Sequence, residues 1–287
     1  MGRELRFRGA ALHKTIWAAG PLITNPEMVE QVHIDYIRAG ADIITTNTYG
    51  IIRTELAKEG IEERFEELNL LACTLAQNAR KKTDRDVLIA GSLPPLRGSY
   101  RPDLVGPLHE IEPLYREQAR ILTPFVDLFI CETMSSGTEA LAAATAAIRF
   151  GKPVWVAWTL FDDHSGKLRS GESVEQAMTK LSGINVTGCL ANCCAPESIE
   201  AFLENGVQQH ADWVGGYANT FSPVPTTWTL SGDGASDGLL PLREDLSPDS
   251  YGHFVRHWLQ HGANVVGGCC GTRPAHTAVM RAILDEF

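Results

Sequence analysis

Residues 25–49 read NPEMVEQVHIDYIRAGADIITTNTY, a helix pattern that runs directly into a strand pattern. Asn25 can cap a helix, Pro26 fits its first turn, and Gly40 can end it. The apolar residues between them recur on one helical face. Residues 41–49 are β-branched and apolar at their start and polar at their end. That gradient is typical of a barrel strand whose carboxyl end faces a functional site.

The same helix-and-strand unit recurs along the rest of the chain, at about 30 to 40 residues a unit, which predicts a parallel sheet with right-handed crossovers. Polar or reactive residues follow all seven visible strands, whereas a doubly wound sheet gathers its site in one crevice. We therefore predict an α/β fold, a (β/α)8 barrel formed as one domain by residues 1–287, with its first strand missing or truncated at the N-terminus. The predicted strands are 41–49, 87–92, 127–132, 153–160, 188–193, 213–220 and 264–268, and the predicted helices are 1–9, 25–40, 61–82, 110–123, 136–150, 173–181, 196–205, 247–261 and 273–287.

Composition excludes several classes of partner. The net charge of −10 argues against nucleic acid and anionic membranes. No run approaches the ~18 apolar residues of a membrane span, and the first residues lack the apolar core of a signal peptide. Seven cysteines without a secretory signal indicate free thiols in a reducing compartment, so we expect a cytoplasmic protein. Cys73 and Cys189 are read as ordinary buried small hydrophobes.

Two adjacent thiols, Cys269 and Cys270, follow the short apolar run 265–266 and are bracketed by glycines. Adjacent cysteines do not comfortably bond each other, and Cys193 stands at the end of another predicted strand, 188–193. Zinc is the usual metal for several cysteines, and three protein ligands with an open fourth position distinguish a catalytic site. The alternative is a set of buried free cysteines. The matched strand ends favour the metal.

A zinc ion with three thiolates carries net negative charge and is a poor activator of water. It can hold a substrate thiol as a thiolate, because metal binding lowers the pKa of the thiol. The pattern therefore favours alkyl transfer to a thiol substrate.

These residues resemble the homocysteine S-methyltransferase family, which includes betaine-, S-methylmethionine- and cobalamin-dependent enzymes. The resemblance covers nearly the whole chain and implies a (β/α)8 barrel. It is carried by the zinc motifs Asn192-Cys193 and Gly267-Gly268-Cys269-Cys270-Gly271-Thr272, and by Met1 to Leu5, Asn25 to Glu27, Arg38 to Asp42, Thr46 to Tyr49, Gly91-Ser92 and Glu132-Thr133.

Carried over residue by residue, the resemblance implies that Cys193, Cys269 and Cys270 are zinc ligands. Cys194 matches no family ligand and is read as a bystander. Glu132 would hold the substrate amino group, and a carboxylate at a barrel strand end is more often functional than solvated. Further substrate-binding candidates, each weighed against plain core or strand-end packing, are Trp17 near the methyl donor and Thr46, Asn47, Tyr49, Ser92, Asn192 and Asn219 around the pocket.

The chain departs from the family pattern at its start. In relatives an Asp-Gly-Gly turn at the end of the first strand precedes the segment that matches Met1 to Leu5. The aspartate of that turn helps bind the amino group of homocysteine. A barrel without that strand would leave unpaired backbone groups on its neighbours, at a cost on the order of 1 to 3 kcal/mol each. We therefore expect a truncated or misassigned start rather than a barrel that lacks the strand.

The expected reaction joins homocysteine, whose sulfur becomes the fourth zinc ligand, to a small cationic methyl donor, and yields methionine. At this length there is no room for cobalamin or folate domains, which favours S-methylmethionine or S-adenosylmethionine as the donor. Betaine is the alternative donor, and a selenol could replace the thiol. The rival readings are a catalytically silent zinc-binding relative without the amino-group site, and a metal-free barrel enzyme. Residues 221–246 form a long loop at the expected rim, either a lid or a plain excursion.

Overall fold

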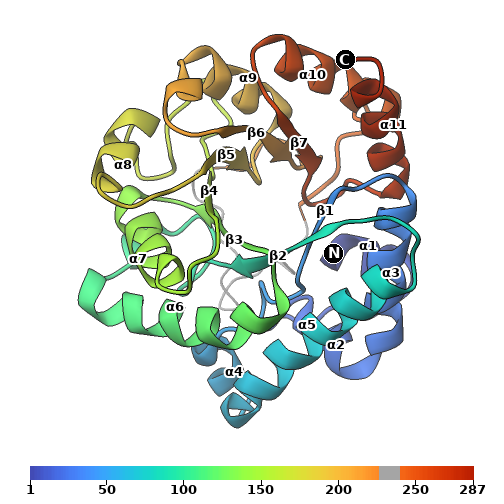
Figure 1. The fold of residues 1–287 in the computed structure, drawn as a ribbon, viewed down its shortest axis with the longest axis vertical. Coiled ribbons are helices and arrows are strands. Elements are labelled where there is room, and N and C mark those ends of the chain that lie inside the picture. The colour runs from blue at the N-terminus through green and yellow to red at the C-terminus, as the bar shows by residue number, and fades with distance from the viewer. Residues whose placement is uncertain (226–239) are drawn as a thin grey trace.

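Seven parallel strands curl into a ring in the computed structural model, which describes residues 1–225 and 240–287. Each strand pairs with the next in chain order, and the helices surround the ring on its outside (Figure 1). The described residues contain seven strands and no eighth, which confirms the predicted barrel fold without its first strand; the truncated or misassigned start stays a prediction. The strands are β1 (Ile43–Thr45), β2 (Leu88–Leu93), β3 (Leu128–Met134), β4 (Val154–Trp158), β5 (Gly188–Asn192), β6 (Trp213–Ala218) and β7 (Val265–Gly268).

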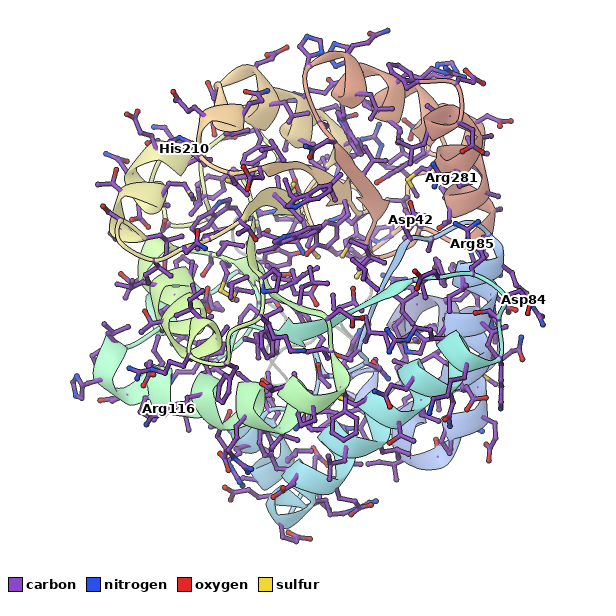
Figure 2. All side chains as sticks on the ribbon, viewed as in Figure 1. Asp42, Asp84, Arg85, Arg116, His210 and Arg281 are labelled. Carbon is purple, nitrogen blue, oxygen red and sulfur yellow. The ribbon has the colours of Figure 1, made fainter. Side chains whose placement is uncertain are left out.

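The ring is open between β1 and β7, which do not pair within the described residues. Helix α1 (Gly2–Phe7) lies beside this opening in Figure 1. One ion pair spans the opening at the amino ends of the strands: Asp42, just before β1, binds Arg281 of the last helix at 2.9 Å. Asp42 also binds Arg85, just before β2, at 3.1 Å, and Figure 2 shows these three side chains grouped together. An ion pair therefore joins the two edges of the barrel wall where no strand pairing does.

The predicted helices are present with ends shifted by a few residues, but two short helices, α2 and α4, were not predicted. Asn25 precedes α3 without a side-chain cap; its Oδ1 accepts from Thr24 Oγ1 at 2.9 Å instead. No helix among the described residues is long and apolar enough to cross a bilayer. Besides α1, the helices are α2 (Ala19–Thr24), α3 (Pro26–Arg38), α4 (Arg53–Lys58), α5 (Phe65–Lys81), α6 (Leu108–Leu122), α7 (Gly137–Ile148), α8 (Val174–Lys180), α9 (Pro196–Glu204), α10 (Pro248–Gln260) and α11 (Pro274–Leu284), with 3-10 turns at Glu62–Arg64, Pro102–Leu104, Thr123–Phe125 and Val207–Gln209.

Strand β6 aligns the two segments that carry the cysteines. Asn192, the last residue of β5, stands opposite Tyr217, and Gly268, the last residue of β7, stands opposite Ala218. The carboxyl ends of β5 and β7 therefore lie on either side of the end of β6. Apolar side chains between the ring and its helices form the main core, and β4 is buried along its whole length. This packing fixes the strand ends at which the candidate site lies.

Candidate metal centre and substrate cavity

The sulfur atoms of Cys193, Cys269 and Cys270 all lie within 4.8 Å of one another. Backbone hydrogen bonds to the end of β6 hold them there. The amide of Cys193 donates to the carbonyl of Tyr217 at 3.3 Å, and that of Cys269 to the carbonyl of Ala218 at 2.8 Å. The structure thus brings together three thiols from two strand ends through the strand between them.

Glycines allow the turn that carries the adjacent thiols. A Cβ atom at Gly268 would lie 2.3 Å from Thr272 Oγ1. Gly271 has φ +88°, and a Cβ there would lie 2.0 Å from Thr220 Oγ1. Any other residue at either position would collide with its neighbours. The glycines therefore let this loop pack closely against Thr272 and Thr220.

The three thiols share one electrostatic environment. Hydrogen bonds with Cys193 and Cys269 hold the pKa of Cys270 well below its usual range, so Cys270 ionises first of the three. Tyr100, Phe221 and Val224 form an apolar group with Cys193, and the partly buried Cys269 and Cys270 pack against it. The remaining cysteines do not belong to the cluster. Cys194 is fully buried in the main core, and Cys73 and Cys189 are buried thiols whose pKa burial raises to about 12.

The cysteine cluster fits a zinc ion. Zinc–sulfur bonds of about 2.3 Å in a tetrahedron place sulfurs about 3.8 Å apart, within the separation seen here. Cys193, Cys269 and Cys270 also line the large cavity of the barrel, so a fourth position can face a substrate. Three ligands with an open fourth position are the pattern of catalytic rather than structural zinc.

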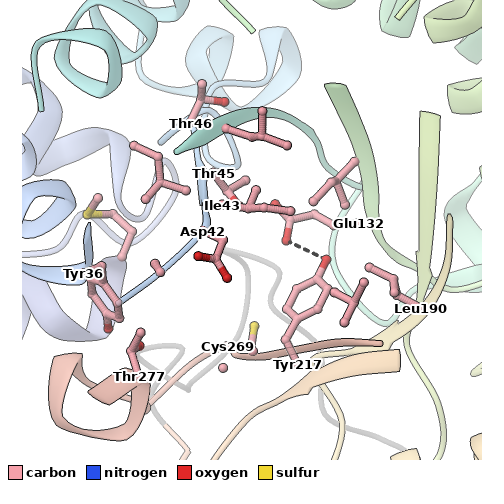
Figure 3. Close-up of a pocket in the computed structure, with 18 of the residues that line it drawn as sticks. Tyr36, Asp42, Ile43, Thr45, Thr46, Glu132, Leu190, Tyr217, Cys269 and Thr277 are labelled. Atoms are coloured by element: carbon pink, nitrogen blue, oxygen red, sulfur yellow. Dashed lines mark hydrogen bonds between the residues drawn. The ribbon is translucent and has the colours of Figure 1, made fainter. Parts of the chain in front are cut away.

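Glu132 lies on the same cavity as the cysteines, in β3. Ser92 donates a hydrogen bond to one carboxylate oxygen, and the Tyr217 hydroxyl donates to the other at 3.4 Å. Burial raises the pKa of Glu132 above the ordinary carboxyl value. Figure 3 shows Glu132 and Cys269 facing the cavity with Tyr217 close to both. The site thus pairs a thiol cluster with a buried carboxylate, which suits a substrate that carries a thiol and an ammonium group.

The cavity has a volume of about 900 Å³ and extends down the inside of the ring. Among the predicted residues, Trp17, Thr46, Asn47 and Tyr49 line it together with Glu132 and the three cysteines. Asn47 is held by its Nδ2, which donates to the carbonyl of Ala18 at 3.0 Å, and the Tyr49 hydroxyl lies 2.6 Å from Ser99 Oγ. The first contact holds the cavity wall next to Trp17, and the second joins the segment after β1 to the loop after β2.

Three predicted residues, Ser92, Asn192 and Asn219, lie behind the cavity wall. Ser92 supports Glu132. Asn192 is fully buried; its Oδ1 accepts from the amide of Thr133 at 2.8 Å, and its Nδ2 donates to Thr133 Oγ1 at 2.9 Å. Asn219 accepts from the amide of Phe221 at 3.0 Å. These three side chains therefore support residues that line the cavity and do not line it themselves.

Residues with strained backbone conformations are concentrated around this cavity. Within the described residues, five non-glycine residues have φ between +46° and +62°, and all but His164 line the cavity. Such conformations persist only where surrounding contacts enforce them, and they are concentrated at functional sites. The strained residues on the cavity are Trp17, Tyr100, Thr133 and Cys193.

Several residues on the cavity were not predicted from the sequence. Tyr217 is the next-to-last residue of β6, and Tyr36 of α3 donates to the carbonyl of Thr272 at 2.8 Å. His33 of α3 is buried, and burial lowers its pKa to about 3, so its ring is neutral. Tyr100 follows the Gly98-Ser99 pair in the loop after β2 and contacts Cys193. The sequence did contain one indication of this. His33 and Tyr36 are three positions apart, which puts both side chains on the helix face that meets the barrel.

A model of the homocysteine S-methyltransferase family matches residues 1–284. The chain belongs to this family. Its relatives include Homocysteine S-methyltransferase of Escherichia coli strain K12, with 27% identity over 98% of this chain and 92% of the relative. Homocysteine S-methyltransferase 1 of Arabidopsis thaliana has 27% identity over 95% of this chain and 87% of the relative.

Solved structures agree with this membership. The homocysteine methyltransferase MmuM of Escherichia coli in its metallated form is similar with a TM-score of 0.79 and 27% identity, over 98% of this chain and 92% of that one. Its oxidised form gives a TM-score of 0.81 and 26% identity, over 99% of this chain and 93% of that one. A metallated relative and the three-cysteine cluster here both indicate a metal-binding family fold.

Proposed function

We propose that this protein transfers a methyl group from a small sulfonium compound, S-methylmethionine or S-adenosylmethionine, to the thiol of homocysteine, giving methionine. Membership of the homocysteine S-methyltransferase family supports homocysteine as the methyl acceptor. The observation that carries the proposal is the placement of the three thiols and Glu132 on one cavity. Zinc held by Cys193, Cys269 and Cys270 would lower the pKa of the substrate thiol, so that the nucleophile exists at neutral pH.

Glu132 would bind the ammonium of homocysteine. Its carboxylate sits in a buried position, where an unpartnered charge is costly, and an arriving ammonium removes that cost. Ser92 and Tyr217 orient the two oxygens, so the ammonium meets a fixed carboxylate rather than a mobile one. The acceptor would thus be held at both ends, with its amino group at Glu132 and its sulfur toward the cysteines.

Aromatic side chains would hold the donor. Trp17 and Tyr49 line the cavity, and aromatic faces attract cations. In the reaction the acceptor sulfur forms a bond to the methyl carbon while the bond from that carbon to the sulfonium sulfur breaks. The electron pair stays on the donor sulfur, which leaves as a neutral thioether, and the thiol proton passes to solvent. Because the donor loses its charge, an apolar and water-free surrounding favours the forward step; this is a hypothesis about the ground state.

An assay with labelled acceptor tests the proposal. Homocysteine with a ¹³C backbone is offered with S-methylmethionine, S-adenosylmethionine or betaine in turn, and ¹³C-methionine is measured by mass spectrometry. The label separates methionine made from the acceptor from methionine left behind by S-methylmethionine. We expect ¹³C-methionine from a sulfonium donor and at most a trace from betaine. Betaine as the best donor would overturn the donor assignment, and no product from any donor would overturn the proposed activity.

A further inference from the structure

Tyr100 contacts a predicted zinc ligand directly. Its hydroxyl lies 3.0 Å from Cys193 Sγ and 2.9 Å from the carbonyl oxygen of the same residue. The side chain is buried and comes from the loop after β2, 93 positions away in the sequence. Tyr100 has φ +62° and Cys193 has φ +53°. Both residues have a positive φ, which is costly for a residue other than glycine. Because they also contact each other, the fold enforces this contact.

A buried ion pair holds the ring of Tyr100 in place. The guanidinium of Arg169 lies 4.7 Å from the ring centre, within the range of a cation–π contact. Arg169 pairs with Asp162 at 3.3 Å, and both side chains are almost fully buried. Asp162 also accepts from the amide of Ala195 at 2.8 Å, two residues after Cys193. One carboxylate therefore fixes both the cation behind Tyr100 and the loop that carries Cys193.

The direction of the hydrogen bond matters for the chemistry. A zinc ion with three thiolates carries a net charge of −1, and a fourth thiolate would raise it to −2. A hydroxyl that donates to one sulfur withdraws charge from it, and a hydrogen bond to an ionised acceptor is stronger than a neutral one. Groups that hydrogen-bond to metal ligands orient them and change the affinity of the site. The single hydroxyl proton of Tyr100 has two acceptors within reach, the sulfur and the carbonyl oxygen of Cys193, and only donation to the sulfur changes the charge on the metal ligand. Donation to the carbonyl alone would only support the loop.

We propose that Tyr100 is a positioning residue for the metal centre: its hydroxyl donates to the thiolate of Cys193, and Arg169 and Asp162 hold its ring so that this bond persists. This inference rests on the proposed zinc site and assigns a role to residues outside the set of metal ligands and outside the predicted substrate contacts.

The test compares Tyr100→Phe with the wild type in zinc affinity and in the spectrum of the cobalt-substituted protein. Phenylalanine keeps the ring over Arg169 and removes only the hydroxyl. We expect zinc affinity, measured by competition with a chelator, to fall by about 10- to 100-fold. The sulfur-to-cobalt charge-transfer band should move to longer wavelength, because the Cys193 sulfur regains the charge that the hydrogen bond withdrew. A purely structural role would leave this band in place.

Two further samples keep the test decisive. Tyr115→Phe is the matched control: Tyr115 is fully buried in α6, and among the described contacts no hydrogen bond joins it to Cys193, Cys269 or Cys270. 3-Fluorotyrosine at position 100 keeps the fold and makes the hydroxyl a stronger donor, so the band should move to shorter wavelength. It also decides the question if Tyr100→Phe does not fold.

The outcomes separate this inference from the proposed function. Opposite band shifts for the two changes at Tyr100, with no shift for Tyr115→Phe, support it. A wild-type band and zinc affinity in Tyr100→Phe, or no shift with 3-fluorotyrosine, overturn it while the zinc site stands. A wild-type protein that binds neither zinc nor cobalt overturns the zinc site itself, and the inference with it.

Discussion

We expect Cys269→Ala to leave the purified protein without zinc and without methyl transfer. Apparent binding energies of structural zinc are about 10 to 16 kcal/mol, so one ligand in four accounts for roughly 3 to 4 kcal/mol and its loss weakens zinc binding on the order of 100- to 1,000-fold. Zinc content is measured by mass spectrometry after gel filtration, and methionine formation is measured on the same sample. Because Cys269 is partly exposed at the end of β7, the change leaves no deep cavity in the core.

The matched control is Cys194→Ala, which removes a neighbouring buried thiol that lies in the main core rather than in the cluster. It should lose some stability but keep a full equivalent of zinc. Equal zinc in the wild type and Cys269→Ala would contradict the assignment of ligands, and equal loss in both variants would show that the fold rather than the cluster had been damaged.

We expect Glu132→Gln to keep zinc but to bind homocysteine much more weakly. Glutamine preserves the shape and a hydrogen bond with Ser92 while it removes the charge that would hold an ammonium. Truncating one partner of a buried charge pair costs about 2 to 5 kcal/mol, so we expect kcat/KM for homocysteine to fall by roughly 30- to 1,000-fold or more. Since burial raises the pKa of Glu132, the wild type should also lose affinity as the pH falls through that raised value, and the variant should not.

Glu139→Gln controls for the loss of a buried carboxylate. Glu139 follows the same strand and accepts from the amide and hydroxyl of Ser135 at 2.8 and 2.7 Å, away from the cavity lining. Its kcat/KM should stay near that of the wild type once stability is taken into account. A Glu132→Gln enzyme with unchanged KM and an unchanged pH profile would remove the amino-group role from Glu132.

The strand order and the cysteine cluster could be predicted because both depend on local patterns. The alternation of helix and strand sets the ring, and a thiol at a strand end is placed by the register of its strand. The short helices α2 and α4, of six residues each, have too little periodicity to detect. Strand β1 covers Ile43–Thr45 rather than 41–49, because Thr46 and Thr48 bond each other and the chain turns there.

The distinction between residues that reach the cavity and residues that support it could not be predicted. Ser92 and Asn192 are polar residues at strand ends, as Glu132 is. In the structure Ser92 donates to the Glu132 carboxylate, whereas Asn192 is buried against Thr133, and no sequence pattern separates these roles. The contact between Tyr100 and Cys193 was equally hidden, since it joins a loop without periodicity to a distant strand end. Such roles depend on side-chain packing between segments far apart in the chain.

Removal and return of zinc tests whether methyl transfer depends on the metal. The purified wild-type protein is stripped with a chelator, and methionine formation from homocysteine and the best sulfonium donor is measured before stripping, after it, and after one equivalent of zinc is restored. Activity should be lost with the metal and return with it, while the stripped protein remains folded by circular dichroism. A stripped, folded protein that makes methionine at the original rate would contradict this dependence on the metal.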